Sequence, residues 1–489
     1  IETRNALDRF NPSHKSSQVS RVFLADKKIA SDAMNCTSAA FKHWKTVPVS
    51  SRSKMLFRAA EIIRKSRMDL AALQVIECGK SWHEADADVA EAVDFCEYYA
   101  KTSEIIFRPD VVELAGEVNR NSPIPRGVAV VIAPWNFPLA ILVGMSAAAL
   151  VTGNTVIIKP AEQSSAMALK WMEILLEAGF PPEVISFLPG AGEEIGPCLV
   201  DDIRTSIVAF TGSRKVGLEI FKNAAITLPG QHHVKKVIAE MGGKNAILVD
   251  EDADPDEAIT AIVQSAMDFQ GQKCSACSRV LVPKGMLDTF SNRLASAVAA
   301  RKIGPAENPD CKIGPVIDEE SQLRIERFIQ EASKKTNLIY RGEVGGLKDH
   351  GYYVAPAVFS GADPQSDLCQ EEIFGPVVAV IGYESFGHGL ELANQVPYAL
   401  TAGLFSRNPD RVELFQNQIE AGNVYINRKI TGAMVHRQPF GGFKLSGLGS
   451  KAGGKDYLLQ FVLQRTITEN TMRRGFAPGA ISRSFLIES

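Results

Sequence analysis

An alternation of short apolar runs with helical segments begins near residue 128 and constrains the fold more than any other feature of the sequence. Apolar runs of strand length stand at 128–132, 155–158, 185–188 and 207–210, and helical patterns lie between them, as at 139–151. Strands that are apolar on both faces occur in parallel sheets whose two faces are covered by helices. The sequence therefore predicts an α/β fold with a doubly wound, Rossmann-like sheet.

A second alternation follows Gly242 and Gly243 and extends to about residue 460. Because 489 residues are too many for one hydrophobic core, we predict two α/β domains. The first comprises residues 1–106 and 126–241, and the second comprises residues 242–460. Residues 107–125 and 463–470 instead alternate polar and apolar side chains, and by periodicity alone they read as edge hairpins.

Composition argues against several classes of function. A net charge of −3 with 22% charged residues gives no support to binding of nucleic acid or of a membrane surface. The longest uncharged apolar stretch, 137–158, contains Pro138, Gly153 and Asn154, so it predicts a helix and a strand rather than a membrane span. Eight cysteines with irregular spacing indicate a reducing compartment, and we expect a cytoplasmic protein without a signal peptide.

Three side chains of complementary chemistry stand beside glycine or proline. Cys274 lies in the run Phe-Gln-Gly-Gln-Lys-Cys-Ser-Ala-Cys, Glu240 precedes Met-Gly-Gly, and Asn136 lies in Ala-Pro-Trp-Asn-Phe-Pro. A thiol, a carboxylate and an amide can together perform nucleophilic acyl chemistry. Each also has a simpler interpretation, as a small buried residue, a strand end and a turn former. Because the three occur together, we predict that they are catalytic.

Cys274 and Cys277 form a Cys-x-x-Cys pair, which can indicate redox or zinc chemistry. No second such pair and no histidine pair lies at metal-ligand spacing, so we predict that the protein has no metal site. Cys277 falls one helical turn after Cys274 by spacing, and we interpret it as structural. Lys244 follows Glu240 closely, and we expect it to influence the titration of that carboxyl.

Together with the run Gln438-Pro-Phe-Gly-Gly near the end, these motifs occur in an order that resembles the aldehyde dehydrogenase superfamily, whose members oxidise aldehydes with NAD(P) through a thioester. The resemblance implies an NAD domain, a catalytic thiol domain and a small oligomerisation arm formed by 107–125 and 461–489. It implies that Cys274 attacks the aldehyde, that Asn136 and the Cys274 backbone N–H bind the oxyanion, and that Glu240 activates water. It also implies a homodimer or a higher homo-oligomer.

The cofactor is expected where strands of the first domain end, although the usual Gly-x-Gly-x-x-Gly fingerprint is absent. The run from Thr211 to Gly217 leads from a strand into a helix. Gly212 permits a tight turn there, Ser213 can cap the helix, and the free N–H groups of the helix can face a pyrophosphate. We therefore predict Thr211, Gly212, Ser213 and Gly217 as cofactor residues, with a plain strand-to-helix turn as the alternative.

The family resemblance adds four further cofactor residues. It implies that Lys159 and Glu162 hold the adenosine ribose, and an acidic group there favours NAD over NADP because it repels a 2′-phosphate. It also implies that Glu372 binds the nicotinamide ribose and that Phe374 packs near the ring. The alternatives are a solvated strand-end charge for Lys159, a turn glutamate for Glu372 and a core phenylalanine for Phe374.

Two stretches indicate the substrate. Ser275 offers a hydroxyl, and Gly432 and Ala433 lie in a loop of small residues that exposes backbone N–H groups. Such donors suit a carboxylate at the far end of an aldehyde. Both stretches resemble the branch of the family that oxidises glutamate γ-semialdehyde to glutamate in proline catabolism.

In that branch Phe137 and Phe440 match two aromatic walls around the substrate, although ordinary core packing would also explain Phe440. His436 and Arg437 replace smaller residues of the loop, a departure that can alter it. Three other interpretations stay open: a dehydrogenase for another carboxylated aldehyde such as succinate semialdehyde, a CoA-acylating enzyme, and a non-catalytic relative. Because the chain begins with Ile1, we expect a fragment of a longer protein, either a domain fused to proline dehydrogenase or a trimmed single enzyme.

Overall fold

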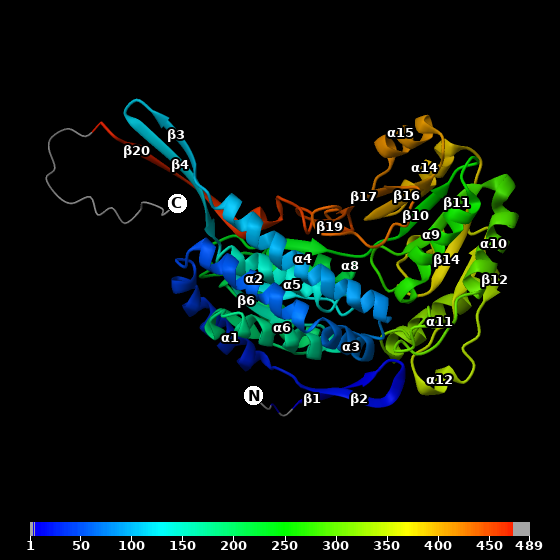
Figure 1. The fold of residues 1–489 in the computed structure, drawn as a ribbon, viewed down its shortest axis with the longest axis horizontal. Helices are drawn as coiled ribbons and strands as arrows, with labels where there is room; N and C mark the ends of the chain where they lie inside the picture. Colours follow the sequence, from blue (N-terminus) through cyan, green and yellow to red (C-terminus); the bar gives the residue numbers. More distant parts are fainter. Residues whose placement is uncertain (1–2, 4, 473–489) are drawn as a thin grey trace.

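The computed structural model describes residue 3 and residues 5–472, which are organised around two large sheets (Figure 1). The first sheet has the strand order β19 (Gly447–Leu448), β9 (Lys236–Glu240), β8 (Thr205–Thr211), β5 (Val128–Ile132), β6 (Thr155–Lys159), β7 (Ile185–Phe187). All neighbours are parallel except β19, which runs antiparallel to β9. The predicted doubly wound sheet is thus confirmed.

Helices cover both faces of this sheet because its strands are apolar on both sides. On β5, Ala129 and Val131 enter a core shared with α2 (Val49–Lys65), α4 (Trp82–Ile106), α5 (Ala140–Val151) and α6 (Ser165–Glu177). The alternate residues Val128 and Val130 pack on the opposite side against α1 (Lys27–Trp44) and α7 (Gly192–Asp201). α3 (Arg67–Cys78) and α8 (Arg214–Ala224) complete the two layers.

The second sheet has the order β12 (Asn337–Arg341), β13 (Ala357–Ser360), β14 (Val377–Tyr383), β11 (Cys277–Pro283), β10 (Asn245–Val249), β16 (Thr401–Phe405), β17 (Asn423–Ile426). Only β12 is antiparallel to its neighbour. The flanking helices are α9 (Pro255–Met267), α10 (Leu287–Ala299), α11 (Glu319–Ser333), α14 (Phe386–Asn394) and α15 (Pro409–Gln418). Cys277 opens the buried strand β11, so its predicted place on a helical turn is wrong, although it is buried.

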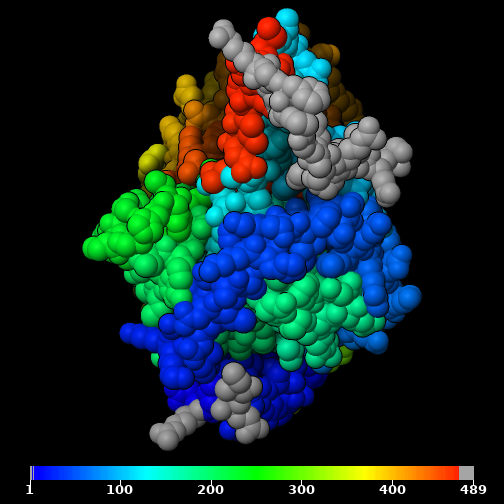
Figure 2. Space-filling model, turned by 90° about the vertical axis from the view of Figure 1, so that its left-hand side faces the viewer, coloured from blue at the N-terminus to red at the C-terminus, as the bar shows by residue number. Residues whose placement is uncertain are grey.

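The two stretches predicted as edge hairpins pair with each other. β3 (Asp110–Leu114), β4 (Glu117–Pro125) and β20 (Val462–Asn470) form one antiparallel sheet, which we call the β arm. The arm extends away from both large sheets in Figure 1, and Figure 2 shows β20 in red beside the cyan hairpin above the blue N-terminal helices. The predicted arm also included residues 473–489, which lie outside the described residues.

An N-terminal hairpin was not predicted from the sequence. β1 (Ala6–Asn11) and β2 (His14–Phe23) run along the molecule towards α12 (Leu347–His350), as Figure 1 shows. The Tyr352 N–H donates to the Pro12 carbonyl, which joins the hairpin to the second half of the chain.

The remaining short helix and strands are α13 (Asp367–Gln370), β15 (Tyr398–Ala399) and β18 (Phe443–Lys444). Within the described residues, no helix is long and apolar enough to cross a membrane.

Candidate active site

The carboxyl ends of the parallel strands bring the predicted groups of the first sheet to one edge. Ile132 of β5 pairs in register with Lys159 of β6, and Thr211 of β8 lies opposite Glu240 of β9. The chain that leaves β5 reaches Asn136 four residues later. Ligands bind at this edge in open α/β sheets because the connecting loops diverge there.

The nucleophile loop, which we define as residues 268–276, precedes β11 of the second sheet. Phe269 and Gln270 have φ values of 53° and 55°, and Gly271 has 67°. A Cβ on Gly271 would lie 2.3 Å from the Gly375 carbonyl oxygen, so only glycine fits. Three consecutive left-handed residues are costly, and such strain is typical of functional loops. They hold Cys274 partly exposed, and its carbonyl accepts a hydrogen bond of 2.7 Å from the Asn245 amide.

Asn136 connects the first sheet with this loop. The amide is buried, and its Nδ2 donates to the Gln272 carbonyl at 3.0 Å, two residues before Cys274. An amide nitrogen has two N–H groups, so one remains for an oxygen formed beside the thiol. The structure therefore brings Asn136 to the nucleophile loop, and its role as an oxyanion donor stays a prediction.

Lys80 holds the backbone of Asn136 in place, and this role was not predicted from the sequence. This fully buried lysine donates to the Asn136 carbonyl at 3.0 Å and lies 3.9 Å from Asp88. Its ammonium also lies 4.2 Å from the ring centroid of Phe137 and 5.0 Å from that of Phe269. Such cation–π contacts are strongest when desolvated. A single lysine in a loop gives no signal in the sequence, because its burial depends on the packing of distant segments.

Glu240 ends β9 and faces a turn that includes Gly441 and Gly442. The Gly442 N–H donates to the carboxylate, whereas Oε2 is buried and has no hydrogen-bond partner among the described residues. Burial raises the pKa of Glu240 to about 8, and the positive charge of Lys451 opposes this shift. The expectation that Lys244 acts on Glu240 is wrong: its buried ammonium lies near Glu372 instead.

The Cys274 thiol is held in its neutral form. Burial raises the pKa of Cys274 to about 12, and the carboxylates of Glu372 and Glu240 act in the same direction, which places both acids near the thiol. Since only the thiolate is a strong nucleophile, the site needs a base or a bound positive charge to activate it. A carboxyl with a pKa raised into the physiological range is suited to take up and release protons.

The predicted ribose residues meet at the sheet edge. The Lys159 ammonium donates to Glu162 Oε1 at 3.0 Å, and the Gly192 N–H donates to the same oxygen at 2.8 Å. Ser213 caps α8 and accepts from the Val216 N–H at 3.4 Å, which leaves N–H groups of the first turn free for a phosphate. This set of a cation, a carboxylate and a helix N-terminus fits a dinucleotide.

Close packing against neighbouring side chains accounts for Gly212 and Gly217 of the predicted phosphate motif. A Cβ on Gly212 would lie 2.6 Å from the Phe210 ring, and one on Gly217 would lie 2.5 Å from Met241 Sδ. Gly217 is buried inside α8, so its observed role is close packing of the helix on β9. Phosphate contact by Gly217 therefore stays a prediction.

Glu372 and Phe374 belong to a loop of the second sheet that precedes β14. Glu372 Oε1 accepts from the Gly243 N–H at 2.9 Å, and burial raises the pKa of this carboxyl to about 7. Phe374 packs edge-on against Trp135 with 5.7 Å between ring centroids. Trp135 adjoins Asn136 and also contacts the Phe269 ring, so Phe374 lies close to the nucleophile loop, and contact of Glu372 and Phe374 with the nicotinamide end stays a prediction.

The loop predicted to anchor the substrate, residues 427–440, packs against α4. Gly432 has a φ of 77°, which favours glycine, and the Ile430 N–H donates to Ser265 Oγ at 3.1 Å. The His436 ring lies 5.1 Å from the Tyr98 ring of α4, so the unusual His436 has a structural contact. Among the predicted substrate residues, Ser275 is buried, whereas Ala433 and Phe440 are half-buried.

One face of α4 forms a further wall that the sequence did not reveal. Glu84, Glu91 and Tyr98 are seven residues apart and therefore share this face. Glu84 pairs with Lys273 of the nucleophile loop at 2.6 Å, and Tyr98 contacts the anchor loop. Glu91 lies between them, and burial raises its pKa to about 8.

Within the described residues no group of three or more His, Cys, Asp or Glu side chains could hold a metal ion.

Comparisons with known proteins agree with this geometry. The model of the aldehyde dehydrogenase family matches residues 1–467. A 1-pyrroline-5-carboxylate dehydrogenase of Geobacillus sp. (strain WCH70) is 44% identical over 472 residues, which cover 96% of this chain and 91% of that protein. The crystal structure of 1-pyrroline-5-carboxylate dehydrogenase from Thermus with bound NAD superposes with a TM-score of 0.93 at 43% identity, covering 96% and 91% of the two chains.

A longer protein is also similar. Proline utilization A from Bdellovibrio bacteriovorus superposes with a TM-score of 0.95 at 48% identity. The match covers 98% of this chain but 50% of the other, so this chain spans about half of that protein's length.

Proposed function

The chain belongs to the aldehyde dehydrogenase family, and from this premise we propose that it oxidises L-glutamate γ-semialdehyde to L-glutamate with NAD and water. This aldehyde is the open form of 1-pyrroline-5-carboxylate, the compound in the names of the curated relatives. The observation that carries the proposal is that Asn136 and Glu240, which both follow strands of the first sheet, converge on Cys274, which precedes a strand of the second sheet. It supports a thiol-based oxidation followed by hydrolysis.

The proposed chemistry begins at Cys274. The thiol first loses its proton to water, its sulfur then attacks the aldehyde carbon, and the resulting oxyanion is held by the free Asn136 N–H and by the Cys274 backbone N–H. Bound NAD would accept the hydride, with Lys159, Glu162, Glu372 and the start of α8 as its binding groups. Trp135 and Phe374 would shield that end from water.

Hydrolysis of the thioester completes the cycle. Glu240 takes a proton from water, the water oxygen bonds to the acyl carbon, and the carbon–sulfur bond breaks to return the Cys274 thiolate. A base at this position favours water over CoA as the acceptor. We therefore propose the free acid as the product.

The substrate's polar end would lie between the anchor loop and α4. Backbone N–H groups at Gly432 and Ala433, with the Ser275 hydroxyl, suit the α-carboxylate. Glu91 supplies a carboxyl on the facing wall. Burial disfavours its charged form, and a bound α-ammonium would stabilise the carboxylate because opposite charges attract strongly away from water. Phe137, held under the Lys80 ammonium, and Phe440 would line the sides.

We also propose the compartment, the oligomeric state and a partner of the protein. Eight free cysteines support a reducing cytoplasm. The exposed apolar side chains of the β arm support a homo-oligomer. The similarity to proline utilization A supports a link with proline dehydrogenase, which forms the precursor of this substrate.

The test is NADH formation by the purified chain with glutamate γ-semialdehyde, beside succinate semialdehyde and beside CoA. We expect preference for the first aldehyde, glutamate as product and no activity in Cys274→Ala. Equal turnover of succinate semialdehyde would refute the substrate assignment, and an acyl-CoA product would refute hydrolysis.

A further inference from the structure

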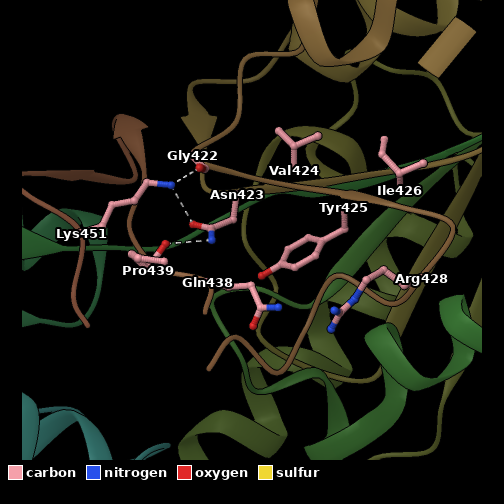
Figure 3. Close-up of a pocket in the computed structure, with 9 residues that line it drawn as sticks. All are labelled: Gly422, Asn423, Val424, Tyr425, Ile426, Arg428, Gln438, Pro439 and Lys451. Atoms are coloured by element: carbon pink, nitrogen blue, oxygen red, sulfur yellow. Dashed lines mark hydrogen bonds between the residues drawn. The ribbon is translucent and has the colours of Figure 1, made fainter. Parts of the chain in front are cut away.

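A polar cluster next to Glu240 has no part in the chemistry described above. Lys451 follows β19, and its ammonium donates to the Gly422 carbonyl and, at 3.3 Å, to Asn423 Oδ1 (Figure 3). Both groups line a cavity of about 470 Å³ with Gln438 and Pro439. Asn423 opens β17, the edge strand of the second sheet, so Lys451 is fixed to a rigid element.

Asn423 connects Lys451 with the turn that faces Glu240. Its Nδ2 donates to the Pro439 carbonyl at 3.0 Å, and its Oδ1 accepts from the Gly441 N–H at 3.3 Å. The amide thus binds the turn 439–442 at two points, while Lys451 binds the amide. Loss of either side chain would release the turn from β17.

The same turn holds the Glu240 carboxylate. The Gly442 N–H donates to it, and a Cβ on Gly441 would lie 2.8 Å from Glu240 Oε1 and 3.3 Å from Lys451 Cγ. The carboxylate and the lysine stem therefore pack against the same glycine. The strand pair between Gly447 and Glu240 closes the segment around the carboxyl.

Three titratable side chains act on Glu240 from the elements around it. They are Lys451 after β19, Tyr457 in the helical turn that precedes β20, and Cys274 in the nucleophile loop. Only Lys451 carries a positive charge at neutral pH. Its attraction favours the carboxylate, the form that accepts a proton from water.

We propose that Lys451 is a positioning residue for Glu240: through Asn423 it fixes the 439–442 turn, and its charge keeps the carboxylate ready to take the proton of the hydrolytic water. The inference rests on the proposed thioester hydrolysis. It assigns Lys451 to the second half of the reaction, because the lysine touches neither Cys274 nor Asn136. Hydride transfer therefore does not depend on it.

The experiment measures NADH formation on the millisecond scale and then at steady state for the full chain and for Lys451→Met. We expect a burst of one NADH per site at the wild-type rate, followed by turnover that is about 10- to 100-fold slower, since a general base contributes at least that much. The acid limb of kcat should move to higher pH. Lys451→Arg, which keeps the charge, should recover most of the rate.

Two further variants separate the interpretations. Lys455→Met removes an exposed charge from the same segment and should behave as wild type. Asn423→Ser keeps the Lys451 charge but loses the link to Pro439, so it should slow hydrolysis even if Lys451→Met fails to fold. Wild-type kinetics and pH profiles in Lys451→Met, or in Asn423→Ser where Lys451→Met does not fold, would overturn the inference. Absence of NADH in the wild type would instead overturn the proposed function.

Discussion

At the scale of single residues, the site depends on charges that are buried and yet paired. Lys80 is the clearest case, because its fully buried ammonium contacts the Asn136 carbonyl, the Phe137 ring and Asp88. Asp88 in turn accepts from the Ala140 N–H at the start of α5. A buried charge is costly unless such partners compensate it. Asn136 and Phe137 are therefore held by one lysine.

Glu91 provides a prediction about specificity. If it binds the α-ammonium, Glu91→Gln should raise KM for glutamate γ-semialdehyde about 10- to 100-fold, since loss of a charged hydrogen bond costs roughly 1.5–3 kcal/mol. The amino-free analogue 5-oxopentanoate should be affected little. Steady-state kinetics with both aldehydes decide this. Equal losses for the two substrates would show that Glu91 has only a structural role.

Glu240 provides a prediction about pH. Its pKa near 8 means that the carboxylate form increases as pH rises towards 8. Where hydrolysis limits turnover, kcat should rise about tenfold per pH unit below that value and level off above it. Glu240→Gln should lose this limb and accumulate acyl-enzyme, which intact-protein mass spectrometry detects. A limb near pH 4 to 5 would contradict the assignment of Glu240 as the base.

At the scale of elements, the nucleophile loop shows why glycine positions matter. Gly271 combines a positive φ with contact to the Gly375 carbonyl, and Gly375 adjoins Phe374. Two loops of the site are therefore packed backbone against backbone. A side chain at position 271 would displace one of the two loops.

Gly271→Ala should consequently lower kcat/KM about 100-fold or more, because displacements of about 1 Å at a reacting group have effects of that size. Gly179→Ala is a matched control: Gly179 also has a positive φ, but a Cβ there would meet nothing within 4 Å. Both variants should lose about 1–3 kcal/mol of stability from backbone strain. Activity assays and urea unfolding check this, and full activity in Gly271→Ala would refute the argument.

At the scale of the whole molecule, the β arm is the part that its own packing stabilises least. Val112 and Leu114 share one face of β3 and are 53% and 63% exposed. Three strands bury little apolar area by themselves, and an exposed apolar face of this kind marks an interface. The arm is therefore where a second copy is expected.

Replacing Val112 and Leu114 by lysine should lower the oligomeric mass, because each charge would have to be buried at the interface. Glu113→Lys lies on the opposite face and changes the net charge by the same amount, so it should leave the mass unchanged. Light scattering after size-exclusion chromatography measures both. An unchanged mass in the double variant would exclude the arm from the interface.

Several parts of this protein could be read directly from the sequence. β5, β6 and β8 were predicted because their residues are apolar on both faces, and Ser213 was predicted as a cap because a hydroxyl before a helix has few other uses. Cys274, Glu240 and Asn136 were predicted as catalytic because reactive groups beside glycine and proline are rare. The hairpin β1–β2 was missed because its strands are mostly polar.

The sequence by itself determined the order of strands and helices, the family and the reactive groups, since these depend on local spacing and residue type. The tertiary structure alone decided which groups meet: Lys451 rather than Lys244 acts on Glu240, Lys80 supports Asn136, and Cys277 lies in a strand. It also decided their protonation, since burial raises the pKa values of Glu240 and Cys274. The physical reason is that desolvation and long-range contact arise only when distant segments pack together.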